Sequence, residues 1–189
     1  MLNFIIYTIK KSNRKETKGL ELKYNNDGTY TVQWHGRCKD TDIIIPSRYY
    51  AYPITIIGRS AFKGREDVTS VVIPDTVNVI KECSFAFCKS LISVTMPNDA
   101  KFLGDHAFYK CKSLNSIVIP NNVKRIEHST FYGCASLTNV TIPSTVTYIG
   151  IWVFAYCTSL TNITYNGTMA QWHQIKFFNH TWDAFTGII

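Results

Sequence analysis

The sequence predicts an α/β solenoid in which short parallel strands stack along one axis, and three observations predict it. Prolines recur at intervals of 23 residues between positions 74 and 143. Phenylalanines and cysteines recur at the same interval. A unit of this size is too small to enclose its own apolar side chains, so the units must stack to share one core.

The period holds in several independent columns of residues. The columns are Pro74, Pro97, Pro120 and Pro143; Phe62, Phe85, Phe108, Phe131 and Phe154; Val68, Leu91, Leu114, Leu137 and Leu160; Cys88, Cys111, Cys134 and Cys157; Val71, Val94, Ile117, Val140 and Ile163; and Ile57, Ile80, Leu103, Ile126 and Ile149. Phenylalanines do not stay in step by chance. We therefore expect about five units, with the phenylalanine rings in a continuous buried ladder.

Each unit is expected to contain one short strand. In one unit, Val140 and Ile142 alternate with Asn139 and Thr141, so two side chains face the core and two face solvent. Pro143 is expected to end this strand because proline offers no hydrogen-bond donor to a sheet. The outward positions of successive strands then form ladders on one face of the solenoid.

Turns are expected on both sides of each strand. Before the strand, Phe131, Cys134 and Leu137 are spaced by threes, which favours a helical or 3₁₀ turn. After the strand, glycine follows an inward aliphatic residue in three units, which predicts a bend with no room for a side chain. These glycines are Gly58, Gly104 and Gly150.

The unit AFYKCKSLNSIVIPNNVKRIE resembles the BspA-like, Treponema-type leucine-rich repeat, which is found in bacterial surface proteins and some protists. The shared pattern is AF, C, SL, a strand ending in IP, then V and IG, and it covers about residues 43 to 165. The resemblance implies a right-handed leucine-rich repeat solenoid. The departures from the pattern are Arg65 for cysteine, Met96 for isoleucine, Ala100 for valine, Lys81 and Glu127 for glycine, and Tyr165-Asn166 for Ile-Pro. We expect them to soften individual turns without breaking the period.

The N-terminal part divides into an arm and a cap. Residues 1–18 form a basic N-terminal arm. Residues 19–42 predict a β-hairpin cap, because LELKYNNDGTYTVQW alternates apolar and polar residues on either side of an Asp27-Gly28 turn. A cap is expected because a stack of repeats exposes apolar surface at its ends.

The repeats and a second cap make up the remainder. Residues 43–168 hold the leucine-rich repeats, with five extra residues between Pro46 and Pro74 that predict a small insertion. Residues 169–189 are rich in aromatic side chains, including Trp182. We expect them to fold over the last unit as a C-terminal aromatic cap.

The charge does not point to nucleic acid. The net charge is +7, but residues 1–25 hold six basic residues against two acidic ones, so much of the excess lies in the N-terminal arm. No apolar run approaches the length of a membrane span. The N-terminus is apolar first and basic after, the reverse of a secretory signal, and no signal peptide is recognised.

The sequence shows no arrangement of residues typical of an enzyme. No Ser/His/Asp set, paired carboxylates or phosphate loop is present, so we expect no catalysis, no cofactor and no metal site. The column cysteines would lie at a spacing that a disulfide tolerates, but their parallel Cα–Cβ directions disfavour bridging. We expect buried, reduced thiols.

Two surfaces are candidates for binding. The outward strand positions form a polar, rather flat face whose short side chains lose little entropy on contact. Its expected binding residues are Ser93, Thr95, Ser116, Val118, Asn139 and Thr141. The alternative that these residues only solvate the sheet stays open. The second surface follows each phenylalanine, where Tyr109, Tyr132 and Tyr156 either contact a partner or pack between turns.

The sequence therefore predicts a non-enzymatic module, a monomer that binds a protein or glycan. The family resemblance implies a place at the microbial cell surface or outside the cell, in adhesion or contact with a host. The alternative is an intracellular interaction scaffold in the cytoplasm, favoured because no signal peptide is recognised.

Overall fold

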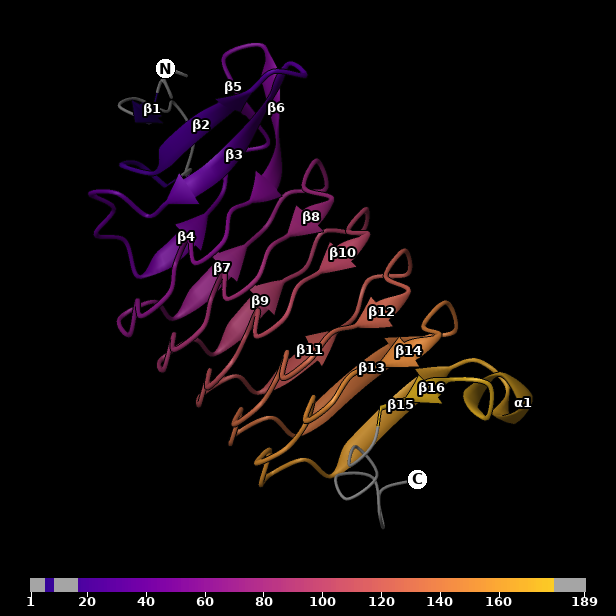
Figure 1. Cartoon of the computed structure of the whole chain (residues 1–189). Helices are drawn as coiled ribbons and strands as arrows, with labels where there is room; N and C mark the ends of the chain where they lie inside the picture. The colour runs from indigo at the N-terminus through magenta and orange to yellow at the C-terminus, as the bar shows by residue number, and fades with distance from the viewer. Residues whose placement is uncertain (1–5, 9–16, 179–189) are drawn as a thin grey trace.

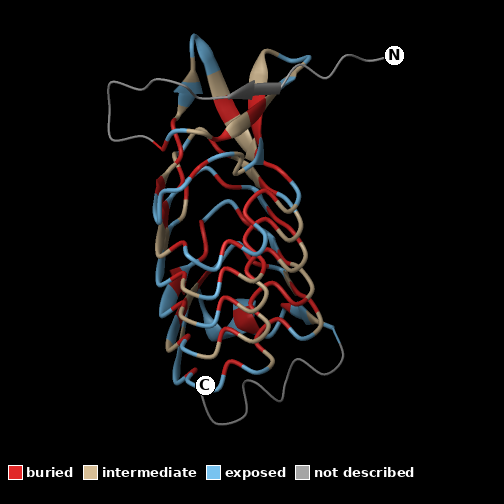
Figure 2. Ribbon diagram, turned by 90° about the vertical axis from the view of Figure 1, so that its left-hand side faces the viewer, coloured by how far each residue is buried: buried red, intermediate tan, exposed pale blue. Residues whose placement is uncertain are grey.

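The computed structural model of the chain describes residues 6–8 and 17–178. The chain forms a solenoid of about six turns made of short parallel strands (Figure 1). Buried residues line the inside of the coil (Figure 2). Most of the basic arm expected at residues 1–18, and Trp182 of the expected C-terminal cap, lie outside the described residues.

Two rows of strands run along the solenoid. The first row contains β4 (Asp42–Ile44), β7 (Ser70–Val72), β9 (Ser93–Thr95), β11 (Ser116–Val118), β13 (Asn139–Pro143) and β15 (Asn162–Asn166). The second row contains β6 (Tyr52–Ile57), β8 (Val79–Ile80), β10 (Phe102–Leu103), β12 (Arg125–Ile126), β14 (Tyr148–Ile149) and β16 (Lys176–Phe177). Paired strands are parallel and lie one repeat apart, as Ser70 lies opposite Ser93. The predicted period is confirmed.

The expected insertion forms a small hairpin. Asp42 of β4 lies opposite Ser70 of β7, so this first turn is five residues longer than the later ones. The extra length holds β5 (Arg48–Tyr49), which pairs antiparallel with the start of β6. The irregular first unit therefore keeps its strands in both rows.

The predicted N-terminal hairpin residues form two antiparallel strands, β2 (Glu21–Asn25) and β3 (Thr29–Trp34). Gly28 between them has a φ of +82°, a conformation that glycine adopts without strain. β3 then pairs in parallel with β6, and β1 (Ile6–Thr8) pairs antiparallel with β2. The hairpin thus extends the second row beyond the first repeat.

The phenylalanine ladder is confirmed. Phe62, Phe85, Phe108, Phe131 and Phe154 stack with centroid separations of 5.1, 5.3, 5.7 and 5.7 Å and interplanar angles of 5° or less. All five rings are buried. The column containing Leu91 and Leu114 is also fully enclosed. The core is thus continuous from one repeat to the next, as stacking of small units requires.

The helical or 3₁₀ turn expected before each strand is present as a run of tight turns with 3₁₀-type bonds, and it does not continue into a helix. The Cys134 N–H donates to the Phe131 C=O at 3.2 Å, and the Leu137 N–H donates to the Cys134 C=O at 3.0 Å. Left-handed residues interrupt the run, since φ is +52° at Ser129 and +70° at Gly133. A helix cannot pass through such residues. Among the described residues, the helix present is α1 (Met169–Trp172), outside the repeats.

The proline at the end of the strand behaves differently in one unit. β7, β9 and β11 end two residues before the proline, whereas β13 includes Pro143. Here Pro143 lies opposite Asn166 of β15. The last unit has Tyr165-Asn166 in place of Ile-Pro, so its backbone keeps the N–H that a proline lacks and the ladder extends further.

The predicted bends without room for a side chain are confirmed. A Cβ atom at Gly104 would lie 2.7 Å from the Glu82 nitrogen, and one at Gly150 would lie 2.8 Å from the His128 nitrogen. Each glycine therefore packs against the backbone of the preceding turn. Only a residue without a side chain permits this approach.

The last described segment lies at the far end of the stack (Figure 1). Thr168 and Gln171 form a reciprocal capping box at the start of α1. The Trp172 ring is buried, and its centroid lies 5.1 Å from that of Tyr165 and 5.5 Å from that of Phe177. Within the described residues, no helix is long and apolar enough to span a membrane.

Candidate binding face

The six predicted binding residues lie on three strands of the first row. β9 carries Ser93 and Thr95, β11 carries Ser116 and Val118, and β13 carries Asn139 and Thr141. Five of the six are exposed, and Thr141 is half-buried. The side chains between them point into the core, as expected for alternating strand positions. We call the surface formed by these six residues the strand face.

Side-chain hydrogen bonds run along part of this row. The Asn162 amide nitrogen donates to the Asn139 side-chain oxygen at 3.2 Å, and the Asn139 amide nitrogen donates to the Thr138 hydroxyl at 2.7 Å. Neighbouring repeats thus connect through their amide side chains. These bonds fix the Asn139 rotamer on β13.

A carboxylate that the sequence reasoning missed stands at the other end of the row. The Ser70 and Thr69 hydroxyls donate to the Asp42 carboxylate at 2.6 and 2.9 Å. These bonds, chiefly the one from Ser70, lower the pKa of the Asp42 carboxyl below its usual value. Asp42 occupies the strand position equivalent to Ser70. A strict count of 23 residues does not reach it, because the first turn is five residues longer.

The strand rows are interrupted between the third and fourth repeats. β4, β7 and β9 form one sheet, while β11, β13 and β15 form another. In the second row, β10 and β12 are likewise not paired with each other. We call this boundary the seam. It is visible as the wide spacing between β9 and β11 in Figure 1.

Backbone hydrogen bonds show how the seam opens. Just before the strands, the Asn115 N–H still donates to the Ile92 C=O at 3.2 Å. In the turn before the seam, the Ile73 N–H donates to the Thr95 C=O at 3.1 Å. Within the described residues, the equivalent bond from the Met96 N–H to the Val118 C=O is absent. The two backbones therefore diverge along the strand.

The opposite side of the solenoid stays closed at the same level. The Phe85 N–H donates to the Ala107 C=O at 2.8 Å, and the Phe108 N–H donates to the Thr130 C=O at 2.9 Å. The rings of Phe108 and Phe131 remain stacked. The seam is thus a wedge that opens only towards the strands.

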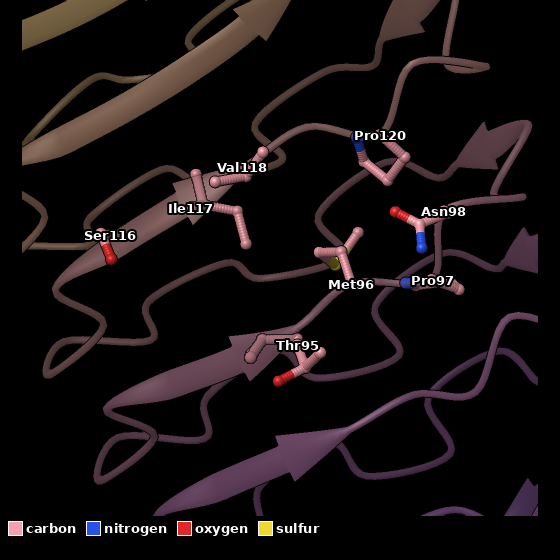
Figure 3. Close-up of a pocket in the computed structure, with 9 residues that line it drawn as sticks. Thr95, Met96, Pro97, Asn98, Ser116, Ile117, Val118 and Pro120 are labelled. Atoms are coloured by element: carbon pink, nitrogen blue, oxygen red, sulfur yellow. The ribbon is translucent and has the colours of Figure 1, made fainter.

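A pocket of about 300 Å³ occupies the seam (Figure 3). Its lining residues are Val94, Thr95, Met96, Pro97, Asn98, Ser116, Ile117, Val118 and Pro120. None of these side chains is ionisable. In Figure 3, Met96 and Ile117 project into the space between β9 and β11. Three residues of the strand face, Thr95, Ser116 and Val118, therefore belong to a concave site and not to a flat sheet.

Two departures from the repeat pattern lie in the unit beside the opening. Ala100 stands where other units have Val77, Val123 and Val146, so two methyl groups are missing from the core under β9. Met96 replaces a branched isoleucine with a flexible side chain. Met96 and Val94 are only half-buried, whereas their counterparts in the next unit, Ile119 and Ile117, are buried. The departures thus coincide with a separation of two sheets, which is more than the softening of one turn that the sequence predicts.

The second candidate surface forms an aromatic ladder on the turn side. The centroid separations along Phe87, Tyr109, Tyr132 and Tyr156 are 5.3, 4.9 and 5.0 Å. Lys110 lies with its Nζ 5.8 Å from the Phe87 ring centre. Tyr109 and Tyr132 are half-buried against each other, and Tyr156 is exposed. Two of the three tyrosines thus pack between turns.

The cysteines are free thiols, and those of the repeat column are buried. Burial raises the pKa of Cys88 and of Cys157 to about 12. Such thiols stay protonated at neutral pH and are poor nucleophiles. No group of three or more metal-ligating side chains occurs among the described residues.

Comparisons with known proteins agree with this architecture. The model of the BspA type leucine rich repeat region matches residues 55–182 in six copies. No match was found among the curated proteins.

Several solved structures share the fold. A leucine rich cell surface protein from Faecalibacterium prausnitzii is 29% identical with a TM-score of 0.76, and the match covers 87% of this chain and 43% of that one. The T. pallidum leucine rich repeat protein is 28% identical with a TM-score of 0.76, covering 79% and 71%. A leucine-rich repeat protein from Bacteroides capillosus, 24% identical with a TM-score of 0.53, covers 81% and 100% and shows the fold alone. The chain thus spans less than half of the Faecalibacterium protein.

Proposed function

Because the chain belongs to the family of BspA-type leucine-rich repeat proteins, we propose that it is a non-enzymatic module that binds a protein through its strand face. The family is consistent with a protein-interaction module, and the face lies on the first row of strands. The observation that carries the proposal is the row of exposed short side chains, held in register within each of the two sheets on either side of the seam.

The chemistry of the face fits a protein partner. Serine, threonine and asparagine side chains donate and accept hydrogen bonds and lose little conformational entropy on contact. Val118 is 63% exposed and Val72 is 40% exposed, so the row also offers apolar contact area. A mixture of apolar and polar groups without strong charge is typical of protein interfaces.

The surroundings of the module are part of the proposal. We place it at a bacterial cell surface or outside the cell, in adhesion or host contact, because the Faecalibacterium protein is described as a cell surface protein. The segments 19–42 and 169–189 act as caps on residues 43–168, and the module is a monomer. The β2–β3 hairpin and the buried Trp172 support these roles, since both add apolar cover at an end of the stack.

A charge-insertion experiment tests the strand face. The double variant Asn139→Lys/Thr141→Lys places two cations on β13, outside the seam pocket. The control, Ser136→Lys/Ser159→Lys, adds the same charge at exposed positions on the turn side. Binding is measured to immobilised extracellular matrix proteins and on a glycan array.

The expected result is that a matrix protein bound by the unmodified chain binds at least tenfold more weakly to the β13 variant, and about equally to the control. Equal weakening in both variants would reject the strand face. Binding on the glycan array alone would replace the protein partner with a glycan.

A further inference from the structure

Resting on the proposed protein-binding role of the strand face, we propose that the seam pocket receives an uncharged, extended peptide segment of the partner. The peptide main chain pairs with the Met96 N–H and the Val118 C=O, and one of its apolar side chains enters the space between β9 and β11. The seam then gives the strand face its selectivity for one partner, because the rest of the face repeats similar side chains.

The unpaired backbone is the first support. The Met96 N–H and the Val118 C=O would bond to each other if the repeat continued unchanged, and among the described residues they do not. Both lie at a sheet edge, because β9 ends one sheet and β11 begins the next. An extended peptide presents alternating N–H and C=O groups that match such an edge.

The lining of the pocket is the second support. Its deeper part is apolar, with Val94 and Met96 half-buried and Ile117 buried. Its rim carries the neutral polar groups of Thr95, Asn98 and Ser116. A charged side chain entering it would lose hydration without gaining a counter-ion. The pocket therefore selects an uncharged segment.

The size and position of the pocket agree with a peptide. A volume of about 300 Å³ is at the small end for ligand sites, which suits a side chain with part of its main chain. Thr95, Ser116 and Val118 of the strand face line the pocket, so a partner lying on the face reaches it directly. A hydrocarbon chain would fill the apolar part but leave the backbone groups unpaired.

Methionine methyl resonances give a local probe. The sequence holds three methionines, and Met96 lies in the pocket while Met169 is exposed in α1 at the end of the stack. With ¹³C-methyl methionine, the neutral peptide Ac-TVTVT-NH2 is titrated into the whole chain. We expect a saturable shift of the Met96 methyl and none of the Met169 methyl.

Three comparison ligands test which kind of molecule the seam pocket binds. Ac-TKTKT-NH2 tests charge, Ac-TVTVT-NH2 with N-methylated valines tests backbone pairing, and the uncharged octan-1-ol tests a hydrocarbon chain. Each is expected to bind at least tenfold more weakly than the neutral peptide. No Met96 shift with Ac-TVTVT-NH2, or equal affinity for any comparison ligand, overturns the proposal.

A closing variant tests the seam itself. Ala100→Val restores the valine of the column under β9 and changes no exposed side chain. We expect it to fold with an unchanged circular dichroism spectrum and to bind the peptide at least tenfold more weakly. Unchanged peptide affinity in this variant would contradict the inference.

The same variant distinguishes this inference from the proposed function. If Asn139→Lys/Thr141→Lys loses binding to a matrix partner and Ala100→Val keeps it, the strand face is supported as the binding surface. The seam is then not part of that surface. A partner lost by both variants supports the two together. A partner unaffected by the β13 variant overturns the function, whatever the peptide does.

Discussion

The thiol of Cys134 donates a hydrogen bond of 3.2 Å to the carbonyl oxygen of Phe108, 26 residues earlier in the chain. The same bond recurs from Cys88 to Phe62, from Cys111 to Phe85 and from Cys157 to Phe131. The cysteine thiols thus give a second donor to carbonyl groups of the phenylalanine column, each of which also accepts a backbone N–H. A small S–H donor explains why cysteine, and not alanine, occupies these positions.

The burial of these thiols predicts their reactivity. In native protein at pH 8, iodoacetamide is expected to modify the half-buried Cys83 and to leave the four column cysteines untouched. In denaturant all six cysteines should react. Mass spectrometry of the alkylated peptides measures both states, and rapid native labelling of Cys111 or Cys134 would contradict the buried column.

The raised thiol pKa values also predict alkaline destabilisation. In the unfolded chain these thiols ionise near the reference value of 9.0, whereas folding raises the pKa of Cys88 and of Cys157 to about 12. Their contribution is fully present below pH 9 and is lost as the pH rises towards 12, because only the unfolded chain then gains by ionisation. In this window, each thiol lowers the free energy of unfolding by up to about 1.4 kcal/mol for every unit that the pH rises.

Urea denaturation between pH 8 and pH 11 measures this effect. Other groups also titrate there, so the comparison is with Cys157→Ala, which removes one thiol. We expect the free energy of unfolding to fall less steeply with pH in the variant. An identical slope in both proteins would show that this thiol ionises equally in the folded and unfolded states.

Truncating a ring of the ladder should be costly. Phe108 is fully buried between Phe85 and Phe131, so Phe108→Ala is expected to lower the free energy of unfolding by about 3–5 kcal/mol. Phe102 is 38% exposed on β10, and Phe102→Ala should cost clearly less. Denaturant titration compares the two, and equal costs would argue against a shared phenylalanine core.

The left-handed column after each phenylalanine gives a clean backbone test. Gly64 has a φ of +76°, and a Cβ atom there would meet nothing within 4 Å. Gly64→Ala therefore isolates the conformational cost, about 1–2 kcal/mol. Lys110 has a φ of +56° in the same column, so Lys110→Gly should be neutral or stabilise the fold by up to about 1 kcal/mol. Thermal unfolding of both variants checks the signs.

A buried arginine ends the cysteine column. In place of cysteine, Arg65 donates to both Asp67 carboxylate oxygens at 2.8 and 2.9 Å and to the carbonyl oxygens of Cys38 and Asp40 at 3.1 and 2.9 Å. Arg65→Ala should lower the free energy of unfolding by about 3 kcal/mol, because the buried Cys38 carbonyl group loses its charged partner.

An exposed pair with the same spacing is the control. Arg125 lies 2.7 Å from Glu127, and its side chain is 53% exposed. Arg125→Ala is therefore expected to cost about 1 kcal/mol or less. Urea denaturation at one pH measures both variants, and a smaller loss at Arg65 than at Arg125 would refute the role given to the buried network.

Much of the fold could be predicted because it depends on repetition. The columns through Phe108 and Leu114 fix which side chains share the core, since each stacked unit repeats the same burial. The chain order alone also predicts the hairpin turn at Asp27-Gly28. The turn before each strand was predicted, but its left-handed residues were not. Only some units have glycine at the left-handed position, as at Gly64 and Gly133, whereas Lys110 takes the same conformation without being glycine.

The sequence by itself thus determined the period, the ladder and the row on which Ser116 and Asn139 stand. Only the tertiary structure decided that the row is split between β9 and β11. Met96 and Ala100 are visible as departures in the sequence, but whether two strands close over them depends on the summed volume of side chains from adjacent turns. That total volume depends on packing in three dimensions and cannot be read from any single column of the repeat.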